Sequence, residues 1–253
     1  MNLDAHVERL TPHLTVFRPL HAGRMPVVLQ FHGCGGVGPM QRSYAEAALS
    51  AGVAAVVVDS LAPRGIGEME ARAAVCTGLK FRGAERALDV LATLQWLREQ
   101  PWADPDRVAA IGWSHGAWAI MEALAGTPPQ AQGRTLPLKS VLLFYPYCGP
   151  LARTRSRGWG ANRPCVYAVI GGRDLVVGRT LPERALRRLE ADGLTVRSRF
   201  FPDATHGFDE EGATGDPRVR YRADLAEQSR AFFVEALRES LGTVEPIHGR
   251  GSS

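Results

Sequence analysis

The sequence predicts a single α/β domain, in which a mostly parallel, twisted β-sheet carries helices on both faces. Short apolar runs rich in valine and alanine alternate with longer amphipathic segments along most of the chain. Such runs are typical of parallel strands buried on both faces, and their alternation with helices is typical of right-handed crossovers. The 253 residues contain no convincing linker or internal repeat. We therefore expect one domain over residues 1–242, without a large cap, followed by a loose tail at 243–253.

The individual elements follow from hydrophobic periodicity. Strands are expected at residues 25–31, 52–59, 107–113, 141–145, 165–170 and 195–201, each a short apolar run. Helices are expected at residues 40–51, 84–100, 117–125, 181–191 and 223–241, where apolar side chains recur at a spacing of three or four. The Gly- and Arg-rich residues 150–163 are predicted to form a surface loop, too short for a separate lid domain.

Composition excludes several classes of partner. The net charge is +4, but 30 basic residues face 26 interspersed acidic ones, so we expect no nucleic-acid surface. The longest apolar stretch, residues 47–58, is too short to span a bilayer, and the first residues lack the pattern of a secretory signal. A soluble cytoplasmic protein without a membrane partner is expected, whereas its oligomeric state stays open.

Four widely spaced cysteines make no zinc-binding pattern. Cys34, Cys76, Cys148 and Cys165 include no CxxC pair. In a reducing cytosol free thiols are the default, and whether Cys34 and Cys76 meet near the active site stays open. No metal and no organic cofactor is expected.

The sharpest chemical signal is Gly112-Trp113-Ser114-His115-Gly116, which fits the pattern G-x-S-x-G. An expected strand precedes it and an expected helix follows it, as a nucleophile on a tight strand-to-helix turn requires. Side chains two residues to either side would clash in such a turn. The sequence therefore predicts Ser114 as a catalytic nucleophile.

A serine nucleophile needs a base and an acid that orients the base. Downstream of Ser114 lie His115, His206 and His248; the first belongs to the turn and the last to the tail, which leaves His206 as the base. Asp174 follows an expected strand through a Gly-rich turn and is the predicted acid. Asp203, three residues before His206, stays open as an alternative.

The oxyanion of the reaction needs two N–H donors. One is expected from the backbone of His115, and the other from the glycine-rich loop at residues 32–36, where Cys34 is favoured over Gly33. A phosphate-binding loop is the competing interpretation, but neither a G-x-G-x-x-G pattern nor a Walker lysine supports it.

Together these motifs resemble the dienelactone hydrolase family of the α/β-hydrolase superfamily, over about residues 15–240. The resemblance rests on residues 32–36, 59–65, 112–116, 172–174 and 205–208, and it implies an esterase-like hydrolase with a triad. The family's namesake enzymes use a cysteine where this chain has Ser114. They also carry a glutamate in the loop that here reads His32-Gly33-Cys34, and an arginine after the catalytic histidine, where Asp209, Glu210 and Glu211 stand here. Both departures argue against dienelactone itself as the substrate.

Substrate contacts are harder to assign. Arg64 roughly matches a family arginine that holds a substrate carboxylate, with a solvated loop arginine as the alternative. Trp113, in the strand-to-helix turn of Ser114, and Tyr145, at a strand end, are candidate residues of the substrate pocket. Packing in the hydrophobic core is the alternative for both.

The predicted function is hydrolysis of small or medium carboxylic esters through an acyl-enzyme, with the ester as the only expected partner. A peptidase, amidase or acyltransferase on the same triad, and a binding protein without turnover, remain as alternatives.

Overall fold

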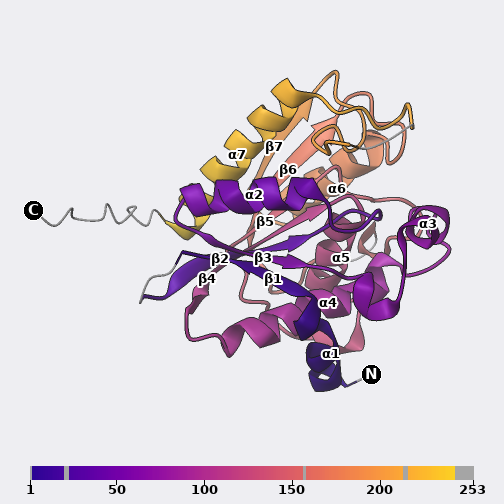
Figure 1. Ribbon diagram of the computed structural model, residues 1–253. Helices are drawn as coiled ribbons and strands as arrows, with labels where there is room; N and C mark the ends of the chain where they lie inside the picture. Colours follow the sequence, from indigo (N-terminus) through magenta and orange to yellow (C-terminus); the bar gives the residue numbers. More distant parts are fainter. Residues whose placement is uncertain (1, 20–22, 156–157, 213–215, 243–253) are drawn as a thin grey trace, which may run out of the picture.

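Seven strands form one sheet in the order β1-β3-β2-β4-β5-β6-β7, in the computed structural model of the chain (Figure 1). The structure describes residues 2–19, 23–155, 158–212 and 216–242, so the predicted tail lies outside the described residues. Only the pairing of β1 with β3 is antiparallel. This confirms the expected mostly parallel sheet. The strands are β1 (Leu14–Phe17), β2 (Met25–Phe31), β3 (Ala54–Val58), β4 (Ala103–Trp113), β5 (Ser140–Phe144), β6 (Cys165–Gly171) and β7 (Val196–Phe201).

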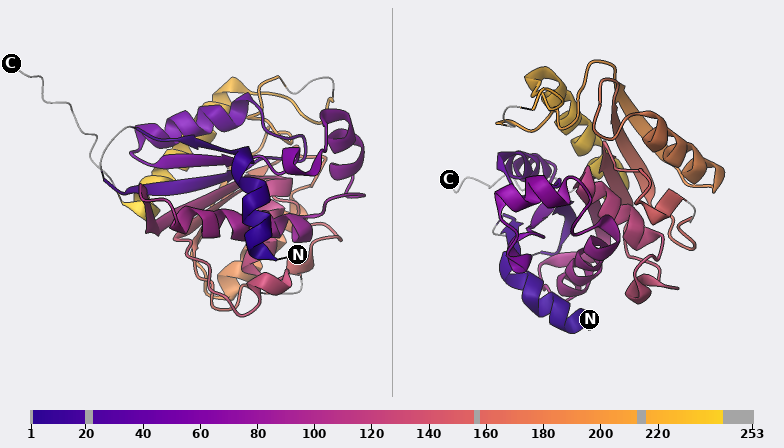
Figure 2. Two further views of the ribbon diagram at one scale, coloured as in Figure 1. Left: turned by 60° about the horizontal axis from the view of Figure 1, so that its bottom comes forward. Right: turned by 90° about the vertical axis from the view of Figure 1, so that its right-hand side faces the viewer.

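Helices cover both faces of the sheet (Figures 1 and 2). They bury two separate apolar layers. The main helices are α1 (Leu3–Leu10), α2 (Pro39–Ser50), α4 (Gly83–Arg98), α5 (His115–Leu124), α6 (Thr180–Ala191) and α7 (Ala223–Leu241). Apolar side chains of α1, α4, α5 and α6 form one layer, and those of α2 and α7 form the other. Because β2 and β3 contact both layers, every residue of these strands is buried, which explains their continuous apolar sequence.

Shorter elements lie between the strands and at the ends. They are η1 (Thr11–His13), η2 (Ala62–Arg64), α3 (Glu68–Glu70), η3 (Ala71–Val75), η4 (Pro129–Ala131) and η5 (Arg153–Arg155). Residues 65–81, which include α3 and η3, are called the cover segment below. Among the described residues, no helix is long and apolar enough to cross a membrane.

The strand order places a topological switch point between β2 and β4. After β2 the chain crosses to β3 on one side, whereas after β4 it crosses to β5 on the other side. Phe31 at the end of β2 is paired with Gly112 near the end of β4, so the two following loops start side by side and diverge. Ligands of open α/β sheets bind at such a switch point. The loop with Cys34 and the turn with Ser114 both begin here.

Candidate active site

Ser114 sits on a strained turn between β4 and α5. Its φ of +50° lies in the left-handed region, which a residue with a side chain rarely adopts. A Cβ on Gly116 would collide with the carbonyl oxygen of Phe31, and one on Gly112 would collide with the backbone of Ala117. The two glycines of the motif are therefore required by close backbone packing, and the predicted turn is what the structure contains.

The structure brings Ser114, His206 and Asp174 into one hydrogen-bonded chain. The Ser114 hydroxyl donates to His206 Nε2 over 2.9 Å, and His206 Nδ1 donates to Asp174 Oδ2 over 2.8 Å. The other carboxylate oxygen of Asp174 accepts from the backbone N–H groups of Val176 and Val177. These bonds fix the histidine tautomer that leaves Nε2 free to accept the serine proton.

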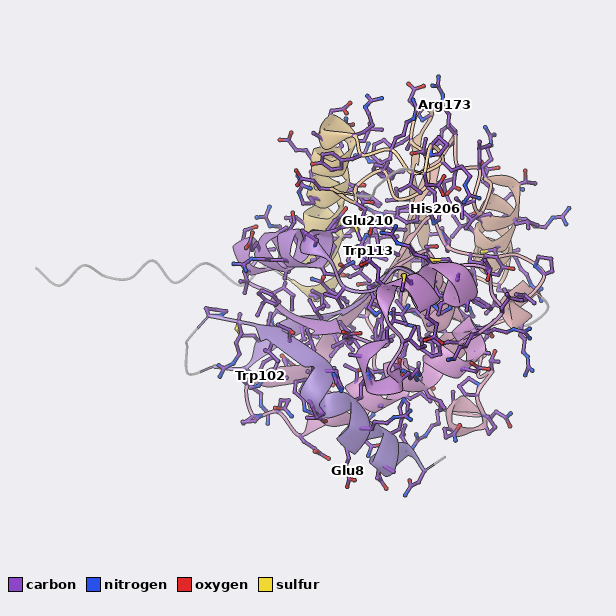
Figure 3. The ribbon with its side chains drawn as sticks, turned by 45° about the vertical axis from the view of Figure 1, so that its right-hand side comes forward. Glu8, Trp102, Trp113, Arg173, His206 and Glu210 are labelled. Atoms are coloured by element: carbon purple, nitrogen blue, oxygen red, sulfur yellow. A yellow bond between two sulfur atoms is a disulfide. The ribbon has the colours of Figure 1, made fainter. Side chains whose placement is uncertain are left out.

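The alternative acid, Asp203, lies elsewhere. Its carboxylate forms an exposed ion pair with Arg173 at 2.8 Å. Arg173 lies at the upper edge of the view in Figure 3. Asp174, in contrast, is almost fully buried beside His206. The geometry therefore supports Asp174 in the orienting position that the sequence analysis favoured.

The two predicted oxyanion donors lie on adjacent loops. His115 is the first residue of α5, so its N–H belongs to the helix turn whose amides have no acceptor within the helix. Cys34 lies on the loop after β2, and this loop runs close to the elbow: a Cβ on Gly33 would lie 3.9 Å from the carbonyl oxygen of Trp113. A helix N-terminus favours negative charge, as an oxyanion hole requires.

Arg86, which sequence analysis did not single out, makes hydrogen bonds to both the loop after β2 and the turn that carries His115. From α4 its buried guanidinium donates through Nε to Ser60 Oγ at 2.9 Å and through Nη1 to the His32 carbonyl at 2.7 Å. Nη1 also lies 3.1 Å from His115 Nδ1. One side chain thus connects the loop of Cys34 with the residue after the nucleophile. The sequence signal that could have identified Arg86 is its place one helical turn before Val90, where a charged residue interrupts the apolar face of the expected helix.

Both histidines of this network are held neutral. Burial and the neighbouring Arg86 lower the pKa of His115 to about 3, so its Nδ1 accepts from Arg86 while Nε2 donates to the Phe81 carbonyl at 2.8 Å. Burial likewise lowers the pKa of His32, whose Nδ1 donates to Gly33 O at 2.6 Å. His32 Nε2 accepts from the Ser60 N–H. Neither ring faces a proton-transfer partner, so both act as fixed hydrogen-bonding groups.

The cysteines contradict the expectation of free thiols. Cys34 and Cys76 form a disulfide, with their Cα atoms 5.0 Å apart, whereas Cys148 and Cys165 are free. The expectation rested on the reducing compartment and on wide spacing in sequence. Spacing does not report distance in the fold, because the cover segment returns to the loop after β2.

Arg64, the predicted contact for a substrate carboxylate, has partners within the protein in this structure. Its guanidinium binds both carboxylate oxygens of the buried Asp89, at 3.0 and 2.8 Å, and stacks on the Phe81 ring. Asp89 accepts in addition from His6 of α1. Arg64 emerges at the expected edge of the sheet, but its ion pair and its π contact commit it to packing.

Trp113 and Tyr145 lie beneath the site rather than in its wall. Tyr145 OH donates to Asp209 Oδ1 at 2.7 Å, and Trp113 Nε1 donates to Asp209 Oδ2 at 3.3 Å. Tyr44 OH of α2 also donates to this carboxylate. The Tyr145 ring stands edge-on to His206, with the centroids 4.8 Å apart. The core-packing alternative holds for both residues.

Asp209 is a second residue that sequence analysis missed. Burial raises the pKa of its carboxyl, while the hydrogen bonds from the two tyrosines and the tryptophan oppose this shift. Because Asp209 follows His206 by three residues, these bonds anchor the turn that presents the histidine. No group of three His, Cys, Asp or Glu side chains suited to a metal ion occurs within the described ranges.

A family model and several solved structures match this chain. The model of the dienelactone hydrolase family matches residues 14–241. Among solved structures, a dienelactone hydrolase-like promiscuous phosphotriesterase from metagenomic libraries is 20% identical, with a TM-score of 0.67, over 91% of this chain and 100% of its own. Thermogutta terrifontis esterase 2, phosphonylated by sarin, is 17% identical (TM-score 0.65; 92% and 91% covered).

A fungal esterase from Rhizomucor miehei is 17% identical, with a TM-score of 0.64, and the match covers 90% of this chain and 79% of that one. At these identities the structural matches establish the fold. A search of curated proteins found no match.

Proposed function

This chain belongs to the dienelactone hydrolase family of α/β hydrolases, and we propose that it cleaves carboxylic esters with Ser114 as the nucleophile. The observation that carries the proposal is the chain of two hydrogen bonds from Ser114 through His206 to Asp174. An unstrained turn would not hold the hydroxyl in this position, and a protein that only binds a ligand does not need the arrangement.

In the first half of the proposed reaction, Ser114 Oγ attacks the ester carbonyl while His206 Nε2 takes its proton. The imidazolium that forms is stabilised by Asp174, which is buried and accepts from Nδ1. The carbonyl oxygen becomes an anion, for which the N–H groups of Cys34 and His115 are the proposed donors. Losing one such donor typically raises the barrier by about 3 kcal/mol.

In the second half, His206 gives its proton to the leaving alkoxide, and the alcohol departs. Water then enters, and His206 removes a proton from it as it attacks the acyl-Ser114 ester. The acid is released and Ser114 regains its proton. Every proton transfer uses Nε2 of the same ring, so the position of the ring must be fixed. Asp174 fixes it by a hydrogen bond to Nδ1, and Asp209 fixes the turn that carries His206.

The size of the substrate follows from the loops at the carboxyl edge of the sheet. In the described part of the connection between β5 and β6 there is one short turn, η5, and no cap domain. From these short loops we infer small or medium esters as substrates rather than long polymeric chains. We propose no nucleic-acid or membrane partner for the reaction.

Labelling and mutation test the proposal. Wild-type protein is expected to hydrolyse p-nitrophenyl acetate and to react covalently with a fluorophosphonate at Ser114. The Ser114→Ala variant should lose both, whereas Ser50→Ala, which removes an exposed hydroxyl of α2, should lose neither. Turnover by Ser114→Ala close to that of the wild type would overturn the assignment of the nucleophile.

The alternatives on the same triad are distinguished by the product. Cleavage of a p-nitroanilide at a rate comparable with that of the matching ester would indicate an amidase. Formation of a new ester when an alcohol is added would indicate an acyltransferase. The neighbouring esterase that carries an organophosphorus group supports the choice of a fluorophosphonate as the label.

A further inference from the structure

Two neighbouring carboxylates follow His206, and they differ in their partners. Asp209 is fully enclosed and accepts from three side-chain donors. Glu210 is half-buried, and among the described residues no side chain or backbone N–H donates to its carboxylate. Burial and the charge of Asp209 raise the pKa of Glu210. A carboxylate in this position is costly unless a positive charge approaches it.

The Glu210 carboxylate lies close to the turn that carries His206. Its Oε2 is 3.4 Å from the position of a Cβ on Gly207, the residue after His206. His206 and Glu210 are both labelled in Figure 3. The charges of His206 and of Arg72, in the cover segment, act on the Glu210 carboxylate. Arg72 does not neutralise it directly, because its guanidinium is bound to Glu68 at 2.8 Å.

The proposed mechanism decides which part of an ester passes Glu210. The carbonyl oxygen must point to the N-terminus of α5 and the loop of Cys34, on β4 and β2. The leaving oxygen must lie within hydrogen-bond distance of His206 Nε2 to receive its proton. The alcohol part of the ester consequently leaves the site along the turn that carries His206 and Glu210.

We propose that Glu210 selects esters whose alcohol part carries a positive charge, such as esters of amino alcohols or of quaternary ammonium alcohols. The inference rests on the proposed ester hydrolysis and adds a substrate class to it. A single carboxylate with no second ligand suits an organic cation, whose charge is spread over several atoms, better than a metal ion. Anionic alcohol parts are repelled by the same carboxylate.

Three acetate esters with the same acyl group test this selection. They are acetylcholine (the choline ester), its neutral isostere 3,3-dimethylbutyl acetate, and the anionic 2-sulfoethyl acetate. The wild type is expected to show kcat/KM in that order. In Glu210→Gln the ratio of the choline ester to the neutral isostere should fall by about tenfold, as expected for a partly exposed charge contact. Glu211→Gln removes an exposed charge next to it and should leave the ratio unchanged.

Several outcomes would overturn the selection. They are equal kcat/KM for the cationic and neutral esters in the wild type, an equal loss on all three esters in Glu210→Gln, and the same change in Glu211→Gln. The last outcome would mean that general surface charge attracts the cation.

The proposed function is tested separately. If the wild type hydrolyses none of these esters and does not cleave p-nitrophenyl acetate, ester hydrolysis itself fails. The selection is then measured as binding of the choline ester to Ser114→Ala by calorimetry, with and without Glu210→Gln. Equal affinity in the two proteins would overturn the role of Glu210.

Discussion

Cys34 and Cys76 join two parts of the site that lie 42 positions apart in sequence. Cys34 lies on the loop of one predicted oxyanion donor. Cys76 belongs to the cover segment, which ends at Phe81, and the carbonyl of Phe81 accepts from the ring of His115, the other predicted donor. The disulfide and this hydrogen bond therefore hold both donor residues against the same segment.

Reduction of the disulfide is expected to destabilise the protein. A cross-link that closes a loop of this length lowers the entropy of the unfolded chain and typically contributes about 2–4 kcal/mol. Urea unfolding with and without a thiol reductant, at one pH, measures the difference. The double variant Cys34→Ser/Cys76→Ser should be less stable than the oxidised wild type and insensitive to reductant. Equal stability of the reduced and oxidised wild type would contradict the prediction.

Replacing a carboxylate by an amide tests whether Asp174 is the acid that orients His206. In Asp174→Asn the amide donates where the carboxylate accepted, so it favours the wrong tautomer of His206. The expected loss in kcat is up to about 10⁴, the size observed for the same change in a serine protease. Asp203→Asn, which breaks only an exposed ion pair with Arg173, should cost less than twofold. If Asp203→Asn is the crippling change, Asp174 has been misassigned.

The buried Arg86 is expected to act as a positioning residue. Its loss frees the His32 carbonyl and the His115 ring, which fix the two donor loops. In Arg86→Ala we expect kcat to fall by about 10- to 100-fold with a much smaller change in KM, because the oxyanion is held less well only in the transition state. Added guanidinium ion should restore part of kcat.

The control for Arg86 is Arg98→Ala, which removes an exposed arginine from the same helix and should leave kcat unchanged. Binding of a boronic acid, which mimics the tetrahedral intermediate, should weaken in Arg86→Ala in parallel with kcat/KM. A rise in KM at constant kcat, or a loss of stability without any guanidinium rescue, would show that Arg86 supports only the fold.

The central strands β2 and β3 were predictable because they are buried on both faces. Val53 to Val58 and the run at residues 25–31 contain almost only apolar residues, so periodicity identified these strands within two residues. The antiparallel edge strand β1 and the helix α1 were not predicted. The side chains of β1 are partly buried or exposed, and the buried polar contact of α1, His6 with Asp89, joins residues 83 positions apart. Local patterns carry no such information.

The residues of the candidate site likewise include some that the sequence predicted and some that it did not. Ser114, Asp174 and His206 follow strand ends, and parallel strands bring their carboxyl ends to one edge, so order along the chain was sufficient to propose them together. The partners of Arg64 and Cys34 were not predictable, because Asp89 lies 25 positions from Arg64 on α4 and Cys76 lies 42 positions from Cys34 in the cover segment. A charged side chain in a loop has many available partners, and only the fold selects one.

The neutral histidines make stability depend on pH. Because the pKa of His115 is lowered to about 3, the folded protein leaves this ring unprotonated where the unfolded chain, with a pKa of about 6.5, binds a proton. The contribution is complete above pH 6.5 and is lost as the pH falls from there towards 3. His32 is shifted in the same direction, whereas the raised pKa of Asp209 acts in the opposite sense.

We therefore expect the unfolding free energy to decrease between pH 6 and pH 4, and His115 alone to contribute a slope of about 1.4 kcal/mol per pH unit. Urea unfolding at pH 6, 5 and 4 measures the slope. In His115→Asn, whose amide binds no proton, the slope should be smaller by about that amount, whatever the absolute stability of the variant. Ser50→Ala, which removes an exposed hydroxyl of α2 and no titrating group, should keep the slope of the wild type. An unchanged slope in His115→Asn would mean that His115 takes up its proton equally in the folded and unfolded states, and that its bonds to Arg86 and Phe81 do not hold it neutral.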